Sequence, residues 1–315
     1  MPDPIAATAA ATDDVSGNAL PPASGVLRLR GRSFGPGRLL VMAIINRTPD
    51  SFYPGARQLA DGVAAEAIAR AADEGAELVD IGGVKAGPGQ DVDVDEELRR
   101  VVPFIERVRR SHPDLLVSVD TWRSEVARQA CAAGADLLND TWAGHDPGLP
   151  AVAAEFGAGL VCSHTGGARP RTRPHRVGYG TDPEGVVDDV LGTLRAAARR
   201  AVAAGIDPAA VLVDPTHDFG KNTWHGLALL RRTQAIAALG HPVLMALSRK
   251  DFVGETLDLP VDERLEGTLA ATAVAAWCGA KVFRAHDVRA TRRTLDMVAS
   301  IRGDRPPAHA VRGLA

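Results

Sequence analysis

The sequence has few cysteines and no long apolar run. Only three cysteines occur in 315 residues, and the spacing of Cys131, Cys162 and Cys278 matches no metal-ligand motif. So few cysteines fit a reducing compartment better than a disulfide-stabilised secreted domain. No apolar stretch approaches the length of a membrane-spanning helix, so we expect no contact with a membrane. A disulfide scaffold, a cysteine-based metal module and an integral membrane protein are therefore excluded.

An excess of charge of one sign is also absent. The formal net charge is −3, so a whole-molecule field that would attract nucleic acid is not evident, and we expect no nucleic-acid partner. Residues 1–20 carry acids but no early Lys or Arg, unlike a signal peptide. We therefore expect a cytoplasmic protein with a disordered lead at 1–24 and a disordered tail at 303–315. Residues 25–302 are predicted to form a single domain, because 45% hydrophobic residues suffice for one large core.

What the sequence does contain is a strand–helix–strand pattern that recurs along the chain. In residues 115–140 an apolar run rich in β-branched residues ends at Asp120, and apolar positions at helical spacing follow. A glycine then ends the helix before a second apolar strand. This junction of glycine and strand occurs six times, at Gly75, Gly134, Gly157, Gly205, Gly240 and Gly279. With two further strands, at 39–45 and 115–119, the pattern predicts eight strands.

Eight strands that alternate with helices predict an α/β fold, a closed (β/α)8 TIM barrel. An open doubly wound sheet is the alternative. It requires fewer strands and a Gly-rich G-x-G-x-x-G turn after the first strand, where this chain has NRTPDSF. Residues 26–38 alternate apolar and basic residues and then turn at Gly35-Pro36-Gly37. We expect them to form a short N-terminal hairpin that closes the bottom of the barrel.

Polar side chains stand at the ends of successive predicted strands. A lone Asp after a strand, such as Asp80 or Asp140, is usually only a helix N-cap. Nine polar residues at strand ends indicate a site instead, because the carboxyl ends of barrel strands converge on one mouth. These residues are Asn46, Asp80, Asp120, Asn139, His164, Asp214, Lys250, Arg284 and His286.

The types of these residues indicate two kinds of ligand group. The two acids and one amide of Asp120, Asn139 and Asp214 can hold a planar ligand with a donor–acceptor edge. Cationic donors come from the ends of the seventh and eighth strands, where barrels commonly bind phosphate. These donors are Lys250, Arg284 and His286.

Seven stretches between about residues 38 and 300 resemble, in order, the motifs of the dihydropteroate synthase family. They are NRTPDSF, DIGG, SVDT, AAGADLLND, DP…FGK, SRK and RAHDV. The resemblance implies a (β/α)8 barrel, usually a homodimer, that acts in folate biosynthesis. The family condenses dihydropterin-CH2-diphosphate with p-aminobenzoate and releases diphosphate, with Mg²⁺ as the cofactor.

The resemblance also implies roles for single residues. Asp120, Asn139, Asp214 and Lys250 would hold the pterin, and Asp120, Asp214 and Lys250 would be the catalytic residues. Asn46, Arg284 and His286 would hold the diphosphate, and Asn46 would also bind the metal. Because loss of diphosphate leaves positive charge on the pterin methylene, carboxylates near the ring and cations near the leaving group both stabilise the reaction. The amine needs no strong base, which agrees with the lack of a nucleophile–base pair.

The second-substrate side departs from the family pattern. The family's DIGGESTRPG is here DIGGVKAGPG, so the Thr and Arg that contact p-aminobenzoate are replaced by Ala86 and Gly87. Lys85 and Arg47 are potential replacement cations. The family's DPG-x-GF is here DPTHDF, which introduces Asp218. On this side we therefore place Lys85, Ala86, Gly87, Phe219 and Ser248.

These departures leave three hypotheses open. The chain is a dihydropteroate synthase, or it resembles the divergent second paralogue of some bacteria and keeps the pterin–diphosphate site with little or no synthase activity. Such a paralogue would be a pseudoenzyme or would use another acceptor. The third hypothesis is another barrel transferase, such as a methyltetrahydrofolate-type enzyme, which the cationic strand-end residues disfavour. Residues 165–182, which hold Arg169, Arg171, Arg173 and Arg176, are predicted to be a solvated loop, with an anion-steering lid as the alternative.

Overall fold

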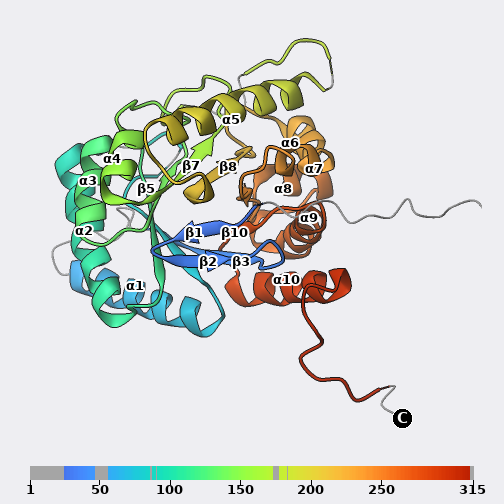
Figure 1. The fold of residues 1–315 in the computed structure, drawn as a ribbon, viewed down its shortest axis with the longest axis horizontal. Coiled ribbons are helices and arrows are strands. Elements are labelled where there is room, and N and C mark those ends of the chain that lie inside the picture. The colour runs from blue at the N-terminus through green and yellow to red at the C-terminus, as the bar shows by residue number, and fades with distance from the viewer. Residues whose placement is uncertain are drawn as a thin grey trace, which may run out of the picture.

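Eight parallel strands form the centre of the molecule in the computed structural model (Figure 1). The structure describes residues 25–46, 56–85, 87–89, 91–172, 177–182 and 184–312. The strands are paired in the order β8-β7-β6-β5-β4-β3-β10-β9. Their bounds are β3 Leu40–Asn46, β4 Leu78–Gly82, β5 Leu116–Asp120, β6 Leu137–Asp140, β7 Gly159–Ser163, β8 Val211–Asp214, β9 Leu244–Met245 and β10 Val282–Ala285.

The sheet closes on itself. The last strand, β10, pairs with the first, β3, in the register Val282 to Leu40. The remaining gap is bridged by Val213 and Val243, and the Val213 N–H donates to the Pro242 carbonyl over 3.0 Å. The predicted (β/α)8 barrel is thus confirmed, and the open doubly wound sheet is wrong.

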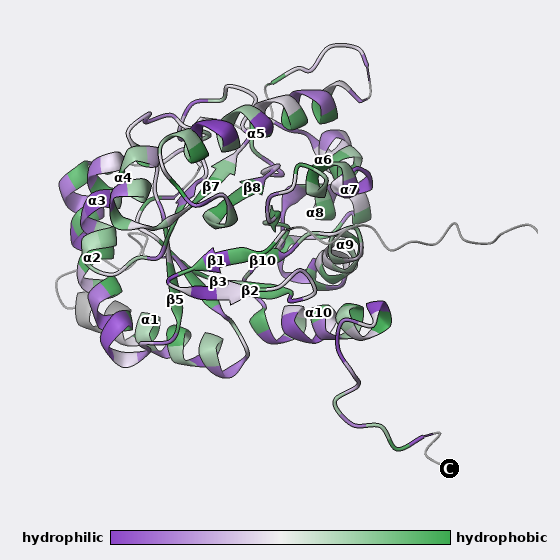
Figure 2. Cartoon of the chain, viewed as in Figure 1, coloured by the Kyte–Doolittle hydropathy of each residue, from purple (hydrophilic) through white to green (hydrophobic). Residues whose placement is uncertain are grey.

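A ring of helices surrounds the strands and buries their outer faces (Figure 1). Every residue of β4 and β7 is buried, as expected for strands covered on both sides, and β7 and β8 are largely hydrophobic in Figure 2. No helix in the described part of the chain is long and apolar enough to cross a membrane. The helices are α1 Ala56–Asp73, α2 Val94–Ser111, α3 Ser124–Ala132, α4 Leu149–Phe156, α5 Gly185–Ala203, α6 Thr223–Arg231, α7 Thr233–Ala237, α8 Asp251–Leu257, α9 Leu265–Trp277 and α10 Val288–Arg302, with short 3-10 turns at Pro208–Ala210 and Val261–Glu263.

Glycine makes the turn from helix to strand at six places. All six glycines that the sequence places before a strand have a left-handed backbone, with φ between 63° and 112°. A residue with a Cβ is strained in this conformation, so glycine lets the chain leave the helix within a few residues. The repeated unit predicted from the sequence is therefore present in the structure.

The N-terminal hairpin covers the amino end of the barrel. It consists of β1 (Leu27–Leu29) and β2 (Arg32–Phe34), which appear in Figure 1 in the middle of the view, inside the ring of helices. A Cβ added to Gly159, at the start of β7, would lie only 2.5 Å from Leu29 Cδ2, so the hairpin is packed into the barrel end. The predicted hairpin is confirmed, but the position of its turn was wrong. The turn is at Arg30–Gly31, with φ of 49° and 70°, whereas Gly35-Pro36-Gly37 follows β2 and leads into β3.

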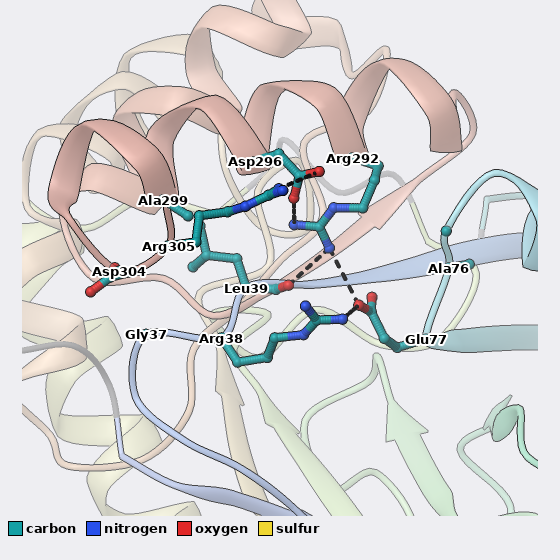
Figure 3. A pocket seen from close by; sticks show the side chains of 11 residues that line it. Gly37, Arg38, Leu39, Ala76, Glu77, Arg292, Asp296, Ala299, Asp304 and Arg305 are labelled. Atoms are coloured by element: carbon teal, nitrogen blue, oxygen red, sulfur yellow. Dashed lines mark hydrogen bonds and ion pairs between the residues drawn. The ribbon is translucent and has the colours of Figure 1, made fainter. Parts of the chain in front are cut away.

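A cavity of about 600 Å³ lies on the same amino side of the barrel, between α10 and the starts of β3 and β4 (Figure 3). Arg292 of α10 donates to the Leu39 carbonyl over 2.9 Å and pairs with Asp296 over 2.9 Å. Glu77 accepts from Arg38 over 2.6 Å. The lining carries three arginines and three acids, so charge is balanced and the contacts join the last helix to the first strands.

Candidate functional site

The carboxyl ends of the strands surround a second cavity, of about 360 Å³, at the opposite end of the barrel. Its lining brings together side chains from five strands, β3, β5, β6, β8 and β10, and from the segments that follow β4 and β9. Nine of the residues predicted from the sequence line it: Asn46, Lys85, Asp120, Asn139, Asp214, Phe219, Lys250, Arg284 and His286. The convergence inferred from strand ends is therefore present in the fold.

A buried ion network lies beneath this cavity. Arg284 Nε lies 2.6 Å from Asp80 Oδ2, and Arg284 Nη2 lies 3.2 Å from Asp120 Oδ2. Asp80 is fully buried and also accepts from Ser118 Oγ over 2.6 Å and from Asn139 Nδ2 over 3.0 Å. Asp80 is therefore the counterion that holds Arg284 and Asn139 in place, and the N-cap interpretation of Asp80 is wrong.

Asp120 is the acid of this network that lines the cavity. Burial and the nearby charge of Asp80 raise the pKa of Asp120 to about 7, against the opposing effects of Arg284 and of the Thr141 hydroxyl. Thr141 Oγ1 donates to Asp120 Oδ1 over 2.9 Å. Asp120 is thus poised to lose its proton when a ligand offers N–H donors.

Asp214 and Lys250 face each other on another side of the cavity. Burial raises the pKa of Asp214, while the charge of Lys250 opposes this shift. The Thr216 N–H donates to Asp214 Oδ1 over 2.6 Å, which fixes the carboxyl group. Lys250 Nζ donates to the His217 carbonyl over 2.6 Å and lies 5.3 Å from the centre of the Phe219 ring. An acid, a cation and an aromatic face thus border one space, which suits a flat polar heterocycle.

His286 and Ser248 form a pair at the end of β10. Ser248 Oγ lies 3.0 Å from His286 Nδ1 and accepts from the His286 N–H over 3.2 Å. Burial and the charge of Arg284 lower the pKa of His286, which favours the neutral ring. A neutral ring still offers one N–H, so His286 stays a predicted donor to an anion in either protonation state. Ser248 does not line the cavity but orients this ring.

His164 does not belong to the cavity, although it was among the nine strand-end residues. Its side chain is fully buried, and Nε2 lies 2.6 Å from Asp189 Oδ1 of α5, on the outer side of the barrel. Asp140 likewise turns outward and accepts from the N–H groups of Trp142 and Gly144. Side chains alternate along a strand, so a residue one position off the inward register faces the helices.

The second-substrate loop offers room but few donors. Lys85 is exposed and lines the cavity, and a Cβ added to Gly87 would meet nothing within 4 Å. Ala86 and Arg47 lie outside the described residues. Asp218 Oδ2 lies 4.0 Å from Lys250 Nζ, so the gained acid is close to the cavity. Of the residues predicted for the second-substrate side, Lys85 and Phe219 line the cavity, whereas Gly87 does not.

Sequence analysis gave no separate role to Lys221, which shapes the loop after β8. Lys221 Nζ donates to the carbonyls of His164, Thr216 and Phe219 over 2.8, 3.1 and 2.8 Å. Burial lowers the pKa of Lys221 to about 7. In the sequence only the FGK motif contained a signal for this role, because the contact with His164 spans 57 residues and the two nearer contacts depend on how the loop after β8 folds.

Hard-oxygen donors are available near Asn46. A Cβ added to Gly82 would lie 3.9 Å from both Asn46 Oδ1 and Asp120 Oδ2, so the two oxygens border the same space. Within the described ranges no cluster of three His, Cys, Asp or Glu side chains suits a metal ion. Mg²⁺ is usually held by one or two protein oxygens together with substrate phosphates, so this donor set fits Mg²⁺ better than a tightly caged metal.

Comparison with known proteins gives one consistent result. The family model "Pterin binding enzyme" matches residues 42–286. A protein of Mycobacterium leprae named "Inactive dihydropteroate synthase 2" is 64% identical over 287 residues, which cover 91% of this chain and 99% of the relative. The dihydropteroate synthase of Bacillus subtilis is 38% identical over 263 residues, covering 83% of this chain and 88% of that enzyme.

Solved structures agree with these relatives. A protein of Mycobacterium tuberculosis has a TM-score of 0.70 and 52% identity, with coverage of 89% of this chain and 99% of that chain. The dihydropteroate synthase of Xanthomonas albilineans, solved with 4-aminobenzoic acid, has a TM-score of 0.78 and 38% identity, with coverage of 89% and 98%.

Proposed function

We propose, from the premise that this chain belongs to the pterin-binding enzyme family, that it binds a dihydropterin diphosphate in the manner of a dihydropteroate synthase. The observation that carries the proposal is the cavity at the carboxyl ends of the strands, which joins Asp120, Asn139, Asp214 and Lys250 with Arg284 in one space. The acids, the amide and the lysine match the donor–acceptor edge of a pterin. Arg284 matches the diphosphate.

In the proposed reaction, the bond between the pterin methylene carbon and the diphosphate oxygen breaks, and a bond forms from that carbon to the acceptor nitrogen. The amine proton passes to solvent, and diphosphate leaves with the electron pair. Asp120 and Asp214 stabilise positive charge at the pterin, while Arg284 and the His286 N–H stabilise the leaving group. Mg²⁺, held by Asn46 and the diphosphate oxygens, would add positive charge at the leaving group.

We further propose that this chain is a weak synthase for p-aminobenzoate. Two relatives at 63–64% identity are named inactive, whereas the named synthases are less similar. In this chain Gly87 offers no side-chain donor and Asp218 adds negative charge near the cavity. At the β4–α2 loop a carboxylate acceptor therefore loses a cationic donor, and Asp218 adds repulsion, so its KM rises and its orientation for attack worsens relative to a synthase with an intact loop.

The test of pterin binding compares an acid of the cavity with an exposed acid. Asp214→Asn keeps the acceptor for the Thr216 N–H but removes the charge, so affinity for the dihydropterin should fall about tenfold or more. Asp188→Asn is the control, because Asp188 is an exposed acid of α5 and is not among the residues that line the cavity. Isothermal calorimetry with dihydropterin diphosphate measures both. Unchanged affinity in Asp214→Asn would remove the pterin site from this cavity.

The homodimer implied by the family is a separate proposal. α9 and α10 carry large exposed apolar side chains, which are Val274, Trp277, Met297 and Ile301. An apolar surface of this kind suits an interface between two copies. Light scattering of the purified chain gives the mass in solution, and a monomer at micromolar concentration would contradict the proposal.

A further inference from the structure

Arg171, in the loop between β7 and α5, reaches the loop that begins at the edge of the candidate active site. Its Nη2 atom lies 3.1 Å from the position that a Cβ on Gly89 would take. Gly89 belongs to the loop between β4 and α2, whose residues Val84 and Lys85 line the cavity. A larger residue at position 89 would press on the guanidinium, so the glycine lets the arginine approach.

Among the described residues, the guanidinium of Arg171 makes no contact that would hold these loops together. Its Nε is buried without a hydrogen-bond partner, and the group makes no ion pair with any residue in the described ranges. The β4–α2 loop is already tied at its two ends. Arg100 donates to the Gly83 carbonyl over 2.7 Å, and Arg123 donates to the Val92 carbonyl over 2.7 Å. Among the described residues nothing neutralises the charge of Arg171, which lies beside this loop between its two fixed ends.

The backbone of Arg171 is also unusual for an arginine. The Arg169 carbonyl accepts from both the N–H and the Oγ1 of Thr172, over 3.2 and 2.7 Å, which closes a turn. Within this turn Arg171 has φ of 61°, a left-handed conformation that favours glycine. Strained non-glycine residues of this kind concentrate at ligand sites, where the side chain is needed.

From this geometry we propose that Arg171 is the anion anchor of the acceptor side and binds the carboxylate of an aminobenzoate-type acceptor. The inference rests on the proposed function, because it assumes that a pterin occupies the cavity. It assigns to the β7–α5 loop a contact that the β4–α2 loop lacks, since Gly87 carries no side chain. A guanidinium whose N–H groups have no partner among the described residues is suited to a carboxylate, which accepts two parallel hydrogen bonds.

The experiment compares Arg171→Gly with Arg169→Ala. The glycine variant relieves the left-handed backbone, so its thermal midpoint should equal or exceed that of the wild type. Arg169 is an exposed arginine in the same loop, and its removal controls for the loss of one charge. Calorimetry first measures dihydropterin binding to each protein, then p-aminobenzoate binding with dihydropterin and diphosphate present. Aniline serves as the acceptor without a carboxylate.

The expected result is a loss of p-aminobenzoate affinity of about tenfold or more in Arg171→Gly alone, with unchanged affinity for dihydropterin, diphosphate and aniline. An equal loss in Arg169→Ala would show that the loss of any positive charge from this loop lowers the affinity, and this would overturn the proposal. A loss of diphosphate affinity in Arg171→Gly would assign the guanidinium to the other anion and also overturn it. Wild type that binds dihydropterin but not p-aminobenzoate would overturn this inference alone, whereas wild type that binds no dihydropterin would overturn the proposed function as well.

Discussion

Single residues in the candidate site act through partners that sequence spacing does not reveal. Arg284 was expected to be a donor for diphosphate, but in the folded chain it is paired with Asp80 and Asp120. A bound diphosphate would therefore share this guanidinium with two carboxylates. Removing Arg284 would leave the buried Asp80 and the partly buried Asp120 without this counterion, which is strongly destabilising. A loss of diphosphate binding in Arg284→Ala is therefore not specific evidence for contact.

The pKa of Asp120 gives a pH-dependent prediction. The pKa of Asp120 is raised from 3.8 in the unfolded chain to about 7 in the folded protein. Between these pH values the folded protein keeps a proton that the unfolded chain has released. The contribution of Asp120 to the free energy of unfolding therefore falls as pH rises from about 4 to about 7. Binding of a pterin that donates to the ionised carboxylate should therefore tighten as pH rises towards about 7, with release of a proton, and then level off. Calorimetry in buffers of different ionisation enthalpy measures the proton release. In Asp120→Asn this part of the pH dependence should vanish, and a profile identical to wild type would show that another group titrates.

At the scale of elements, the N-terminal hairpin was predicted correctly from a local pattern, but the position of its turn, and so the pairing of its two strands, was not. The alternation of apolar and basic residues indicated the strands, but the turn was expected at Gly35-Pro36-Gly37. Arg30–Gly31 makes the turn because Leu27 and Leu29 then both face the barrel and are buried. Burial of this apolar pair at the barrel end decides the register of the hairpin. The residues of the turn do not decide it.

The hairpin should contribute to stability through Leu29. Leu29→Ala removes a side chain that is 2% exposed and leaves a cavity at the barrel end, so the free energy of unfolding should fall by about 2–5 kcal/mol. Leu257→Ala in α8 is the matched control, because that leucine is 49% exposed and its loss should cost less than about 1 kcal/mol. Urea denaturation measures both. Equal losses would mean that the hairpin does not cover the core.

At the scale of the whole molecule, contacts between the two ends of the chain complete the barrel. β10 pairs with β3, and Arg292 of α10 bonds to the Leu39 carbonyl that precedes β3, a separation of 253 residues. The same arginine lies 3.4 Å from Glu77, before β4. One side chain thus connects the last helix with the starts of two strands.

Loss of this connection should be measurable against a nearby arginine. Arg292→Met removes a largely buried group and leaves Glu77 and the Leu39 carbonyl with fewer partners, so the free energy of unfolding should fall by about 1–3 kcal/mol. Arg289→Met, also in α10, removes an ion pair with Glu74 in which the arginine is 64% exposed, and should change it by less than about 1 kcal/mol. If urea denaturation gave the two variants the same stability, the contact at the barrel end would be dispensable.

Local sequence patterns were enough to predict the eight strands, their helices, the glycine junctions and the polar residues at the strand ends. These features depend on neighbours within one turn or one strand, so periodicity and single residues such as Gly134 carry them. Which strand-end side chains share a cavity could be seen only in the folded chain, because that depends on barrel closure and on the inward or outward register of each strand. Folding paired Asp80 with Arg284, turned His164 towards α5 and brought Arg171 against Gly89. Each of these contacts joins residues far apart in the chain, and no local pattern records them.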